Sequence, residues 1–433
     1  MTKICFTPQK KNIAYKIAIY IFFVSIIFFI RLPFGYISDD AVVAPTVTTQ
    51  TIWENFMQRW LYNGRIFTDV LANMFYRIPM IYWKLFDTLV YVIMATLISK
   101  IFTKNTWFDL LMTCGLILLF PINCLNSAGY IATTTNYVYP VLCMLFVAYH
   151  LNLCVKKKHI PIVLYIVTFV SILYATNHDQ GAVFLIGALF LFLIYALCTH
   201  MNQKVIFTTI VLLGFAFCCY VFMFMMPGHL FRMTNTAEMY HWFPQYAEWS
   251  FAKKIYHGFS TTIANLLFTN VKLFFVLCVL IFLQAMSQDS VYKKIISAIP
   301  LAVITFANFF GESKFVVYYD YSCGMPDLIP ISISILPLIL SVTAVCSIFY
   351  TVCSCVKQKE SKFMLLGLLV LSAITRELMG LSATIYASSF RTFTFFLYAI
   401  IICCLILMKD LYDKNNKSNW CVGIGAIFAM FLL

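Results

Sequence analysis

The sequence predicts an all-α polytopic integral membrane protein with about 12 (11–13) transmembrane helices. Hydrophobic residues make up 62% of the 433 residues and charged residues 11%. In a soluble domain, roughly 45–50% of the residues are apolar and about 25% are charged. The mean hydropathy is +0.88. Apolar runs recur along the chain, and many reach the length of about 20 residues that crosses a bilayer as a helix. We therefore expect one membrane domain over residues 1–433, solvated by lipid.

The predicted spans follow one another with short connections. The first one ends in a charged loop without a small-residue cleavage pattern, so we expect a retained anchor and no cleaved signal peptide. A last apolar run, 420–433, is short of spanning length and could lie in the membrane interface. The spans are 13–32, 82–102, 107–123, 137–155, 160–176, 181–199, 205–226, 264–286, 295–311, 328–354, 363–381 and 392–408.

The gaps between spans separate lysine from arginine, so the net charge of +13 bears on topology more than on nucleic-acid binding. Alternate gaps hold clusters such as Lys156–Lys158, which marks these gaps as cytoplasmic together with the N-terminus. A guanidinium is a rigid fork that fits phosphate or carboxylate, so outer-face arginines are candidates for an anion site. Arg31 and Arg77 are expected only to anchor helix ends. The opposite gaps carry every arginine: Arg31, Arg59, Arg65, Arg77, Arg232, Arg376 and Arg391.

The first outer loop, 35–80, contains an amphipathic segment. Trp53, Phe56 and Trp60 recur at helical spacing, and polar side chains occupy the opposite face. This pattern predicts a helix that lies in the membrane interface, with its tryptophans at head-group depth.

An acidic pair, Asp39-Asp40, precedes that helix at the outer end of the first span. Two adjacent carboxylates are costly to desolvate there, so a catalytic role is one interpretation. One carboxylate could accept a proton from an attacking hydroxyl while the other orients it or binds a cation. The alternative is helix capping, because Ser-Asp-Asp is good capping chemistry. Asp39 is nearer the rigid anchor helix and is favoured as the base.

Two polar turns lie on the same predicted face. The turn 129–140 offers hydroxyls, an amide and rings, and its Asn136 and Tyr137 suit sugar recognition. An aromatic belt with a turn is the alternative. The second turn holds His178, Asp179 and Gln180 between two spans. Such side chains at membrane depth are expected to face an aqueous cavity, whereas a tight, internally bonded turn is the alternative.

The second long outer loop, 227–262, begins with Pro-Gly-His. Its His229 is a candidate for sugar or acceptor binding, and Arg232 could bind a phosphate with two parallel hydrogen bonds. Arg65 is a second candidate for the same phosphate. Arg391, at the start of the last long span, is a third candidate, and for this residue the alternative is snorkelling to the membrane interface.

Cofactor motifs are missing from the sequence. It has no P-loop, no G-x-G-x-x-G and no H-E-x-x-H, and its 16 cysteines fall mostly inside spans. No cofactor and no dedicated metal site are therefore expected, although the Asp39-Asp40 pair could recruit Mg²⁺ or Mn²⁺.

Five motifs, taken in chain order, resemble the membrane-embedded GT-C class of glycosyltransferases. More narrowly, they are similar to the bacterial and phage serotype-converting glucosyltransferases that modify O-antigen. The sequence departs from the pattern of this family at two points. Asp179 stands where a glutamate is more usual, and the segment Ser389–Arg391 lacks the upstream proline and acidic residue. The motifs are Asp39-Asp40, Trp60-x-x-Asn-Gly-Arg65, Asn136-Tyr-x-x-Pro140, His178-Asp-Gln180 and Pro227-Gly-x-x-x-Arg232.

The resemblance implies transfer of a hexosyl group, glucosyl first, from a polyprenyl-phosphate donor to a surface polysaccharide such as the O-antigen of lipopolysaccharide. It implies a bacterial inner membrane with a periplasmic active site, and Asp39 or Asp40 as the base. A lipid-linked sugar flippase or secondary transporter is the alternative, although neither internal repeats nor matched broken helices are found. A ligase or polymerase of whole glycan units would share the chemistry.

Overall fold

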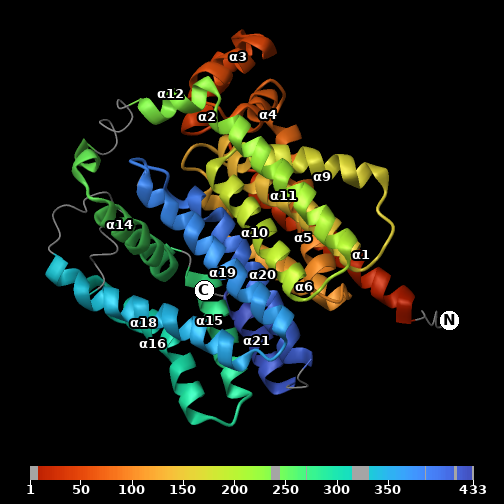
Figure 1. Cartoon of the computed structure of the whole chain (residues 1–433), viewed down its shortest axis with the longest axis vertical. Coiled ribbons are helices and arrows are strands. Elements are labelled where there is room, and N and C mark those ends of the chain that lie inside the picture. Colours follow the sequence, from red (N-terminus) through yellow and green to blue (C-terminus); the bar gives the residue numbers. More distant parts are fainter. Residues whose placement is uncertain are drawn as a thin grey trace. The chain divides into compact units, whose positions relative to one another are not determined.

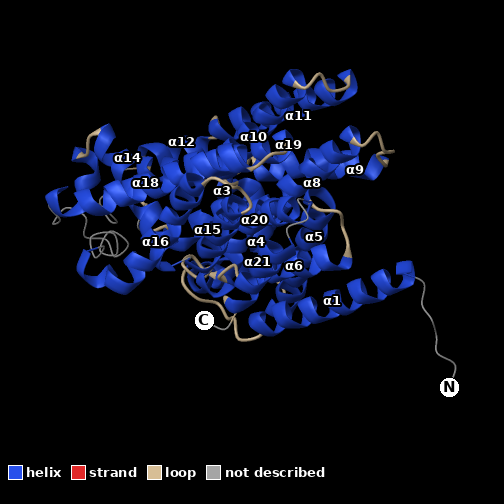
Figure 2. Cartoon of the chain, turned by 90° about the horizontal axis from the view of Figure 1, so that it is seen from below, coloured by secondary structure: helices blue, strands red, loops and turns tan. Residues whose placement is uncertain are grey.

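The computed structural model consists of helices and the loops between them (Figure 2). It describes residues 8–235, 244–269, 271–314, 331–385, 387–413 and 417–431, and no strand occurs among these residues. The chain divides into two compact units. The first comprises residues 1–118 and 122–233, and the second comprises 119–121 and 234–433. Each unit is described by itself.

The described residues contain 10 helices long and apolar enough to cross a membrane, or up to 11 if one sharply bent pair forms a single span. The prediction of a helical polytopic membrane protein is thus confirmed, whereas the count of about 12 is not. The segment 160–176 forms a helix of only 14 residues between Pro161 and Thr176. The predicted span 264–286 falls on the bent pair, Phe251–Phe268 and Val271–Met286.

The long helices of the first unit are coloured red to green in Figure 1. Helices α8, α9, α10 and α11 share one apolar core, which includes Leu151, Ile172, Leu189 and Leu212. Helix α1 contacts α5 and α6, and α5 contacts α8. Their bounds are α1 Pro8–Arg31, α5 Met80–Phe102, α6 Trp107–Leu118, η1 Ile122–Cys124, α7 Tyr130–Thr133, η2 Thr134–Val138, α8 Tyr139–Val155, α9 Ile162–Ala175, α10 Asp179–Cys198 and α11 Gln203–Phe224.

Four short helices gather at one end of the first unit: α2 Asp39–Thr49, α3 Ile52–Tyr62, α4 Ile66–Tyr76 and α12 Pro227–Thr234 (Figure 1). Helix α3 is the predicted amphipathic helix, and it begins with a capping box between Thr51 and Glu54. Phe56 and Trp60 pack against Ile66 of α4 and Met223 at the end of α11, whereas Trp53 remains 67% exposed. This end of the unit holds most of the polar motifs in the sequence.

The second unit is built around α20, which contacts α15, α19 and α21. The predicted interfacial segment 420–433 falls on α21, whose apolar part is short. Residues 236–243 of the second outer loop lie outside the described residues. The bounds are η3 Pro244–Glu248, α14 Phe251–Ala264, η4 Asn265–Thr269, α15 Val271–Met286, α16 Val291–Lys314, α18 Ile331–Cys355, α19 Lys359–Glu377, η6 Leu378–Leu381, η7 Ser389–Phe393, α20 Thr394–Asp413 and α21 Lys417–Ala429.

Candidate functional site

The two carboxylates of the acidic pair lie in opposite environments. Asp39 is the first residue of α2 and is exposed, whereas Asp40 is fully buried. Ser38, which precedes them, has a φ of 53°, a value that L residues rarely adopt. Its hydroxyl donates to the carbonyl of Ser127 at 3.0 Å. Strained backbone of this kind is concentrated at functional sites, because surrounding contacts must hold it.

The carboxylate of Asp40 caps a helix, but not the helix in which it lies. It accepts hydrogen bonds from the Tyr76 hydroxyl at 2.6 Å and from the backbone N–H groups of Ile131 at 2.9 Å and Ala132 at 3.0 Å. Those amides belong to the first turn of α7, which continues through η2 into α8. The alternative interpretation of the pair was capping of its own helix, but the N-cap residue of α2 is Ser38 and its side chain makes no cap bond.

Gly129 makes this contact possible. Its φ is +86°, and a Cβ at this position would overlap the carboxyl group of Asp40. A glycine is therefore required both by the backbone conformation and by the close approach of the carboxylate.

Burial raises the pKa of Asp40, while its hydrogen bonds from Tyr76, Ile131 and Ala132 act in the opposite direction. Burial also raises the pKa of Tyr76, and the negative charges of Asp40 and Asp69 add to the effect. Tyr76 is thus an obligate donor to Asp40. It also lies within electrostatic reach of Asp69, the centre of a second network.

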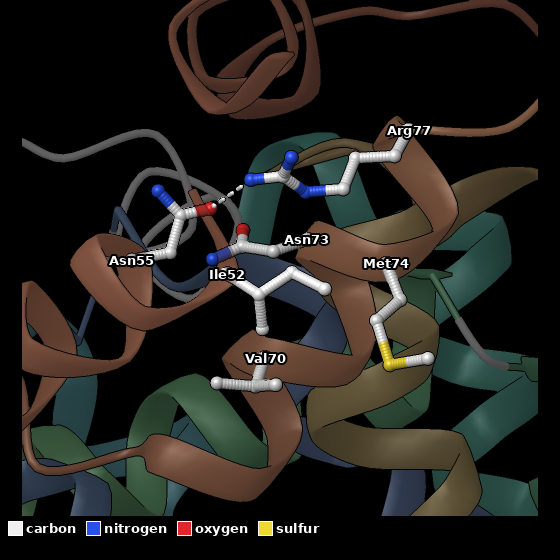
Figure 3. Close-up of a pocket in the computed structure, with 6 residues that line it drawn as sticks. All are labelled: Ile52, Asn55, Val70, Asn73, Met74 and Arg77. Carbon is white, nitrogen blue, oxygen red and sulfur yellow. Dashed lines mark hydrogen bonds between the residues drawn. The ribbon is translucent and has the colours of Figure 1, made fainter. Parts of the chain in front are cut away.

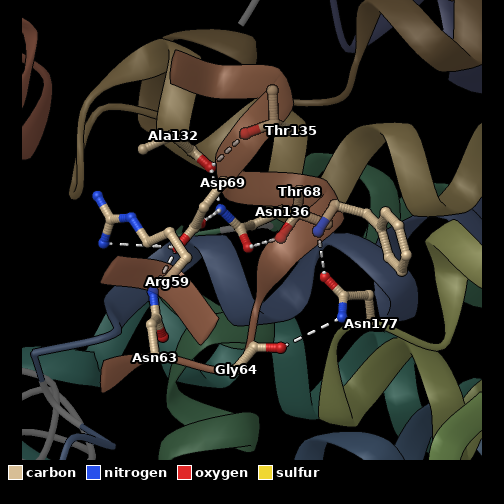
Figure 4. Close-up of polar contacts among 10 residues, drawn as sticks. Arg59, Asn63, Gly64, Thr68, Asp69, Ala132, Thr135, Asn136 and Asn177 are labelled. Carbon is tan, nitrogen blue, oxygen red and sulfur yellow. Dashed lines mark hydrogen bonds and ion pairs between the residues drawn. The ribbon is translucent and has the colours of Figure 1, made fainter. Parts of the chain in front are cut away.

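Asp69 of α4 is contacted by polar side chains from two segments, the end of α3 and η2 (Figure 4). Arg59 approaches it at 3.6 Å, the Asn63 amide donates to it, and the Asn136 amide donates to it at 3.3 Å. Asn136 also accepts from the Thr68 hydroxyl at 2.9 Å. The predicted sugar-binding amide is therefore anchored to α4 by two side chains.

Asn177 joins the third segment to the same region (Figure 4). Its side-chain oxygen accepts from the backbone N–H of Phe67 at 2.8 Å, and its amide donates to the carbonyl of Gly64 at 3.3 Å. The turn that contains His178 and Asp179 is consequently tied to the start of α4.

The fourth segment packs on the Asn63-Gly64 turn through two glycines. A Cβ on Gly228 would lie 2.5 Å from the Asn63 nitrogen, and one on Gly64 would lie 2.8 Å from the His229 nitrogen. Gly64 has a φ of +77°. Neither position has room for a side chain, so α12 and the α3–α4 turn are in backbone contact.

His229 is the centre of a charged cluster in the first unit. It is 6% exposed, its Nε2 lies 3.9 Å from the Asp179 Oδ1, and its Nδ1 has no hydrogen-bond partner among the described residues. Burial lowers the pKa of His229; Asp179 raises it, and Arg232 and Arg65 lower it further. Two of the three predicted phosphate-binding arginines are thus close enough to act on one buried imidazole.

The other predicted residues are distributed as follows. The ring of Tyr137 lies edge-on to that of His178, with centroids 4.6 Å apart, and Gln180 is buried at the start of α10. Arg391 belongs to η7 of the second unit. Because Asp40 already accepts three hydrogen bonds, Asp39 is the member of the pair that remains open to a cation. The described part of the chain contains no cluster of three or more His, Cys, Asp or Glu side chains arranged for a metal ion.

Arg77 has a structural role between α2 and α3. It lines a small hollow with Ile52, Asn55, Val70, Asn73 and Met74 (Figure 3). Its guanidinium donates to the Gln50 carbonyl at 2.6 Å and to the Asn55 Oδ1 at 3.0 Å. Instead of anchoring a helix end at the interface, it fixes the turn between the two helices.

Sequence reasoning missed Asp69 and Tyr76 as members of the site. A single acid on an amphipathic helix is indistinguishable from a solvated side chain, and Tyr76 reads as an aromatic residue of the interface. The one usable signal was helical spacing: Asp69 and Tyr76 are seven residues apart, which places both on one face of α4.

Comparisons of the chain with protein-family models, with curated proteins and with solved structures give no match.

Proposed function

We propose that the chain is a membrane glycosyltransferase. It would transfer a hexosyl group, glucosyl in the first instance, from a polyprenyl-phosphate donor to a surface polysaccharide such as O-antigen. The observation that carries the proposal is the convergence of four polar segments, far apart in sequence, at one end of the first unit. Together they offer guanidinium groups, a buried imidazole and an exposed carboxylate beside membrane-spanning helices.

The cluster around His229 suits the phosphate of such a donor. Arg65 and Arg232 both act on the buried His229, and Asp179 lies beside it. Guanidinium groups bind phosphate oxygens with paired hydrogen bonds, and they hold their charge at any physiological pH. The depressed pKa of His229 keeps the imidazole neutral near pH 7, so it can donate to the ligand without adding a third positive charge.

Asp39 is the proposed base, and Asp40 the residue that positions it. All three donors that reach Asp40 come from the protein itself, so this carboxylate is occupied and inaccessible to an acceptor sugar. Asp39 is exposed and follows the strained Ser38. A carboxylate must lie within hydrogen-bond reach of the hydroxyl that it deprotonates, which only the exposed member of the pair can achieve.

The reaction would proceed by direct displacement at the anomeric carbon. The acceptor hydroxyl oxygen forms a bond to that carbon, its proton passes to Asp39, and the bond between the carbon and the phosphate oxygen breaks. Arg65 and Arg232 would stabilise the negative charge on the departing polyprenyl phosphate. A single displacement of this kind inverts the anomeric configuration. Asn136, Tyr137, His178 and Gln180 would line the sugar or acceptor side.

A reconstituted system distinguishes transfer from transport. The purified protein is placed in liposomes that contain polyprenyl-phosphate-linked radiolabelled glucose, and O-antigen polysaccharide is added outside. The proposal expects labelled glucose to appear in the polysaccharide, with one molecule of free polyprenyl phosphate released for each glucose transferred. Label that crosses the bilayer without entering polysaccharide would instead establish a lipid-linked sugar flippase. Asp289→Asn, which changes an exposed carboxylate of the second unit, is the matched control for variants of Asp39.

A further inference from the structure

The first unit contains a buried ion pair that the proposed reaction does not use. Arg31, the last residue of α1, pairs with Asp87 of α5, and both side chains are 0% exposed. Arg31 was expected to anchor a helix end at the interface, but the structure buries it between helices. Ionisable residues inside a membrane protein are costly, and their retention generally points to a function.

Aromatic rings connect this ion pair with the acidic pair. The Arg31 guanidinium lies 5.2 Å from the ring centroid of Phe34 and 5.1 Å from that of Tyr91. Phe34 stacks on Tyr130, with centroids 3.8 Å apart and an interplanar angle of 5°. Tyr130 opens α7, and the next two amides of that helix are the donors to Asp40.

The connection between α1 and α2 is held at further points. Lys84 of α5 donates to the carbonyl of Leu32 at 2.7 Å, and the Ser38 hydroxyl donates to Ser127 at 3.0 Å. Residues 32–38 are therefore fastened at their beginning to α5 and at their end to the segment before α7. The strained φ of Ser38 requires such external support, because the chain would relax without it.

We infer that the Arg31–Asp87 ion pair is a positioning device for the acidic pair of α2, acting through Phe34 and Tyr130. This inference rests on the proposed function for its kinetic consequence, and on the contacts alone for its structural one. The ion pair holds the end of α1 and the start of α7 in one arrangement, and so holds Asp39 where it can act.

The decisive variant replaces both charges with apolar side chains. A buried ion pair can often be exchanged for apolar residues of similar volume without loss of stability, whereas removal of one partner leaves an uncompensated charge. The double variant Arg31→Met, Asp87→Leu removes both charges together and leaves only the buried hydroxyls of Tyr91 and Tyr139 without these partners, so it is expected to fold, with a Tm somewhat below the native value. If the pair only stabilised the fold, this variant would be fully functional.

Two measurements on purified protein test the inference. Hydrogen exchange of the peptide 32–40 is expected to accelerate by about 10-fold or more, because the segment loses its support. The kcat for transfer is expected to fall by roughly 10- to 100-fold while KM stays within about twofold, since small misplacement of a reacting group has effects of this size. The single variant Arg31→Lys, which keeps the charge but loses the planar fork, should change both quantities in the same direction.

Tyr20→Phe provides the matched control. Tyr20 of α1 is hydrogen-bonded to Thr96 of α5 at 2.8 Å, so the variant weakens the same helix pair away from the acidic residues. The inference would be overturned if the double variant showed the same exchange rate and kcat as this control. It would also be overturned if the double variant showed faster exchange with a native kcat. If the native protein transfers no sugar, the proposed function fails, and the exchange rate alone decides whether the ion pair holds the segment.

Discussion

The carboxylate of Asp40 accepts a hydrogen bond at 2.9 Å from the backbone N–H of Ile131, 91 positions further along the chain. Asp40 thereby caps the N-terminus of the helical segment from Tyr130 to Val155, which is long and apolar enough to cross a membrane. A negative charge at a helix N-terminus is favourable because the free N–H groups point toward it. The contact gives Asp40 a structural role, and the proposed function therefore takes Asp39 as the base.

Gly129→Ala should destabilise the first unit. The added Cβ would overlap the Asp40 carboxyl group, and alanine is strained at a φ of +86°. We expect a loss of more than about 2 kcal/mol, seen as a lower Tm in detergent. Gly214→Ala is the control, because a Cβ there meets nothing within 4 Å, and alanine in a helix is favoured over glycine by roughly 1 kcal/mol. An unchanged Tm for Gly129→Ala would contradict the described contact.

Asp40→Asn should lower stability, whereas Asp39→Asn should not. The asparagine amide would present N–H groups to some of the three donors that now reach the carboxylate. An unsatisfied buried polar group costs about 1–3 kcal/mol. Asp39 is exposed, and asparagine is as compatible as aspartate with the start of a helix. Equal Tm values for both variants would remove the distinction between the two residues.

The pH dependence of stability should report on His229. Because its pKa is lowered in the folded protein, the unfolded chain binds more protons between that value and 6.5. Its contribution to stability is therefore present above pH 6.5 and is lost as the pH falls through the lowered pKa. Tm measured from about pH 8 down to about pH 5 should fall less steeply in His229→Asn than in the native protein. Parallel curves would show that His229 does not titrate as described.

Arg65→Lys should weaken binding of polyprenyl phosphate by about 10-fold without a change in Tm, because a point charge replaces a bidentate fork. Arg77→Lys is the control, for which we expect the opposite pair of results. Arg77 donates to Gln50 and Asn55, so its loss should lower Tm and leave phosphate affinity unchanged. Binding can be measured by calorimetry with the sugar-free lipid phosphate. Equal affinities for the two variants would exclude Arg65 from the phosphate site.

Local sequence signals predicted the helices better than the contacts of the site. The helical spacing of Trp53, Phe56 and Trp60 is a local signal, and α3 forms where this spacing predicts a helix. The positions of Asn136 beside α4 and of His229 beside Gly64 depend on contacts across 67 or more residues, which local sequence patterns do not reveal. Asp40 illustrates the same limit, because its burial is decided by Gly129 and by the first turn of α7.

The central claim is that Asp39 is the catalytic base, and one rate tests it most directly. Transfer of labelled glucose from polyprenyl phosphate to polysaccharide is measured for Asp39→Asn in liposomes, beside the native protein and Asp289→Asn. An asparagine cannot accept the proton, so kcat should fall by roughly 10²–10⁴ while Tm and reconstituted amount stay native. Asp289→Asn should retain the native rate. A native rate in Asp39→Asn would contradict the assignment.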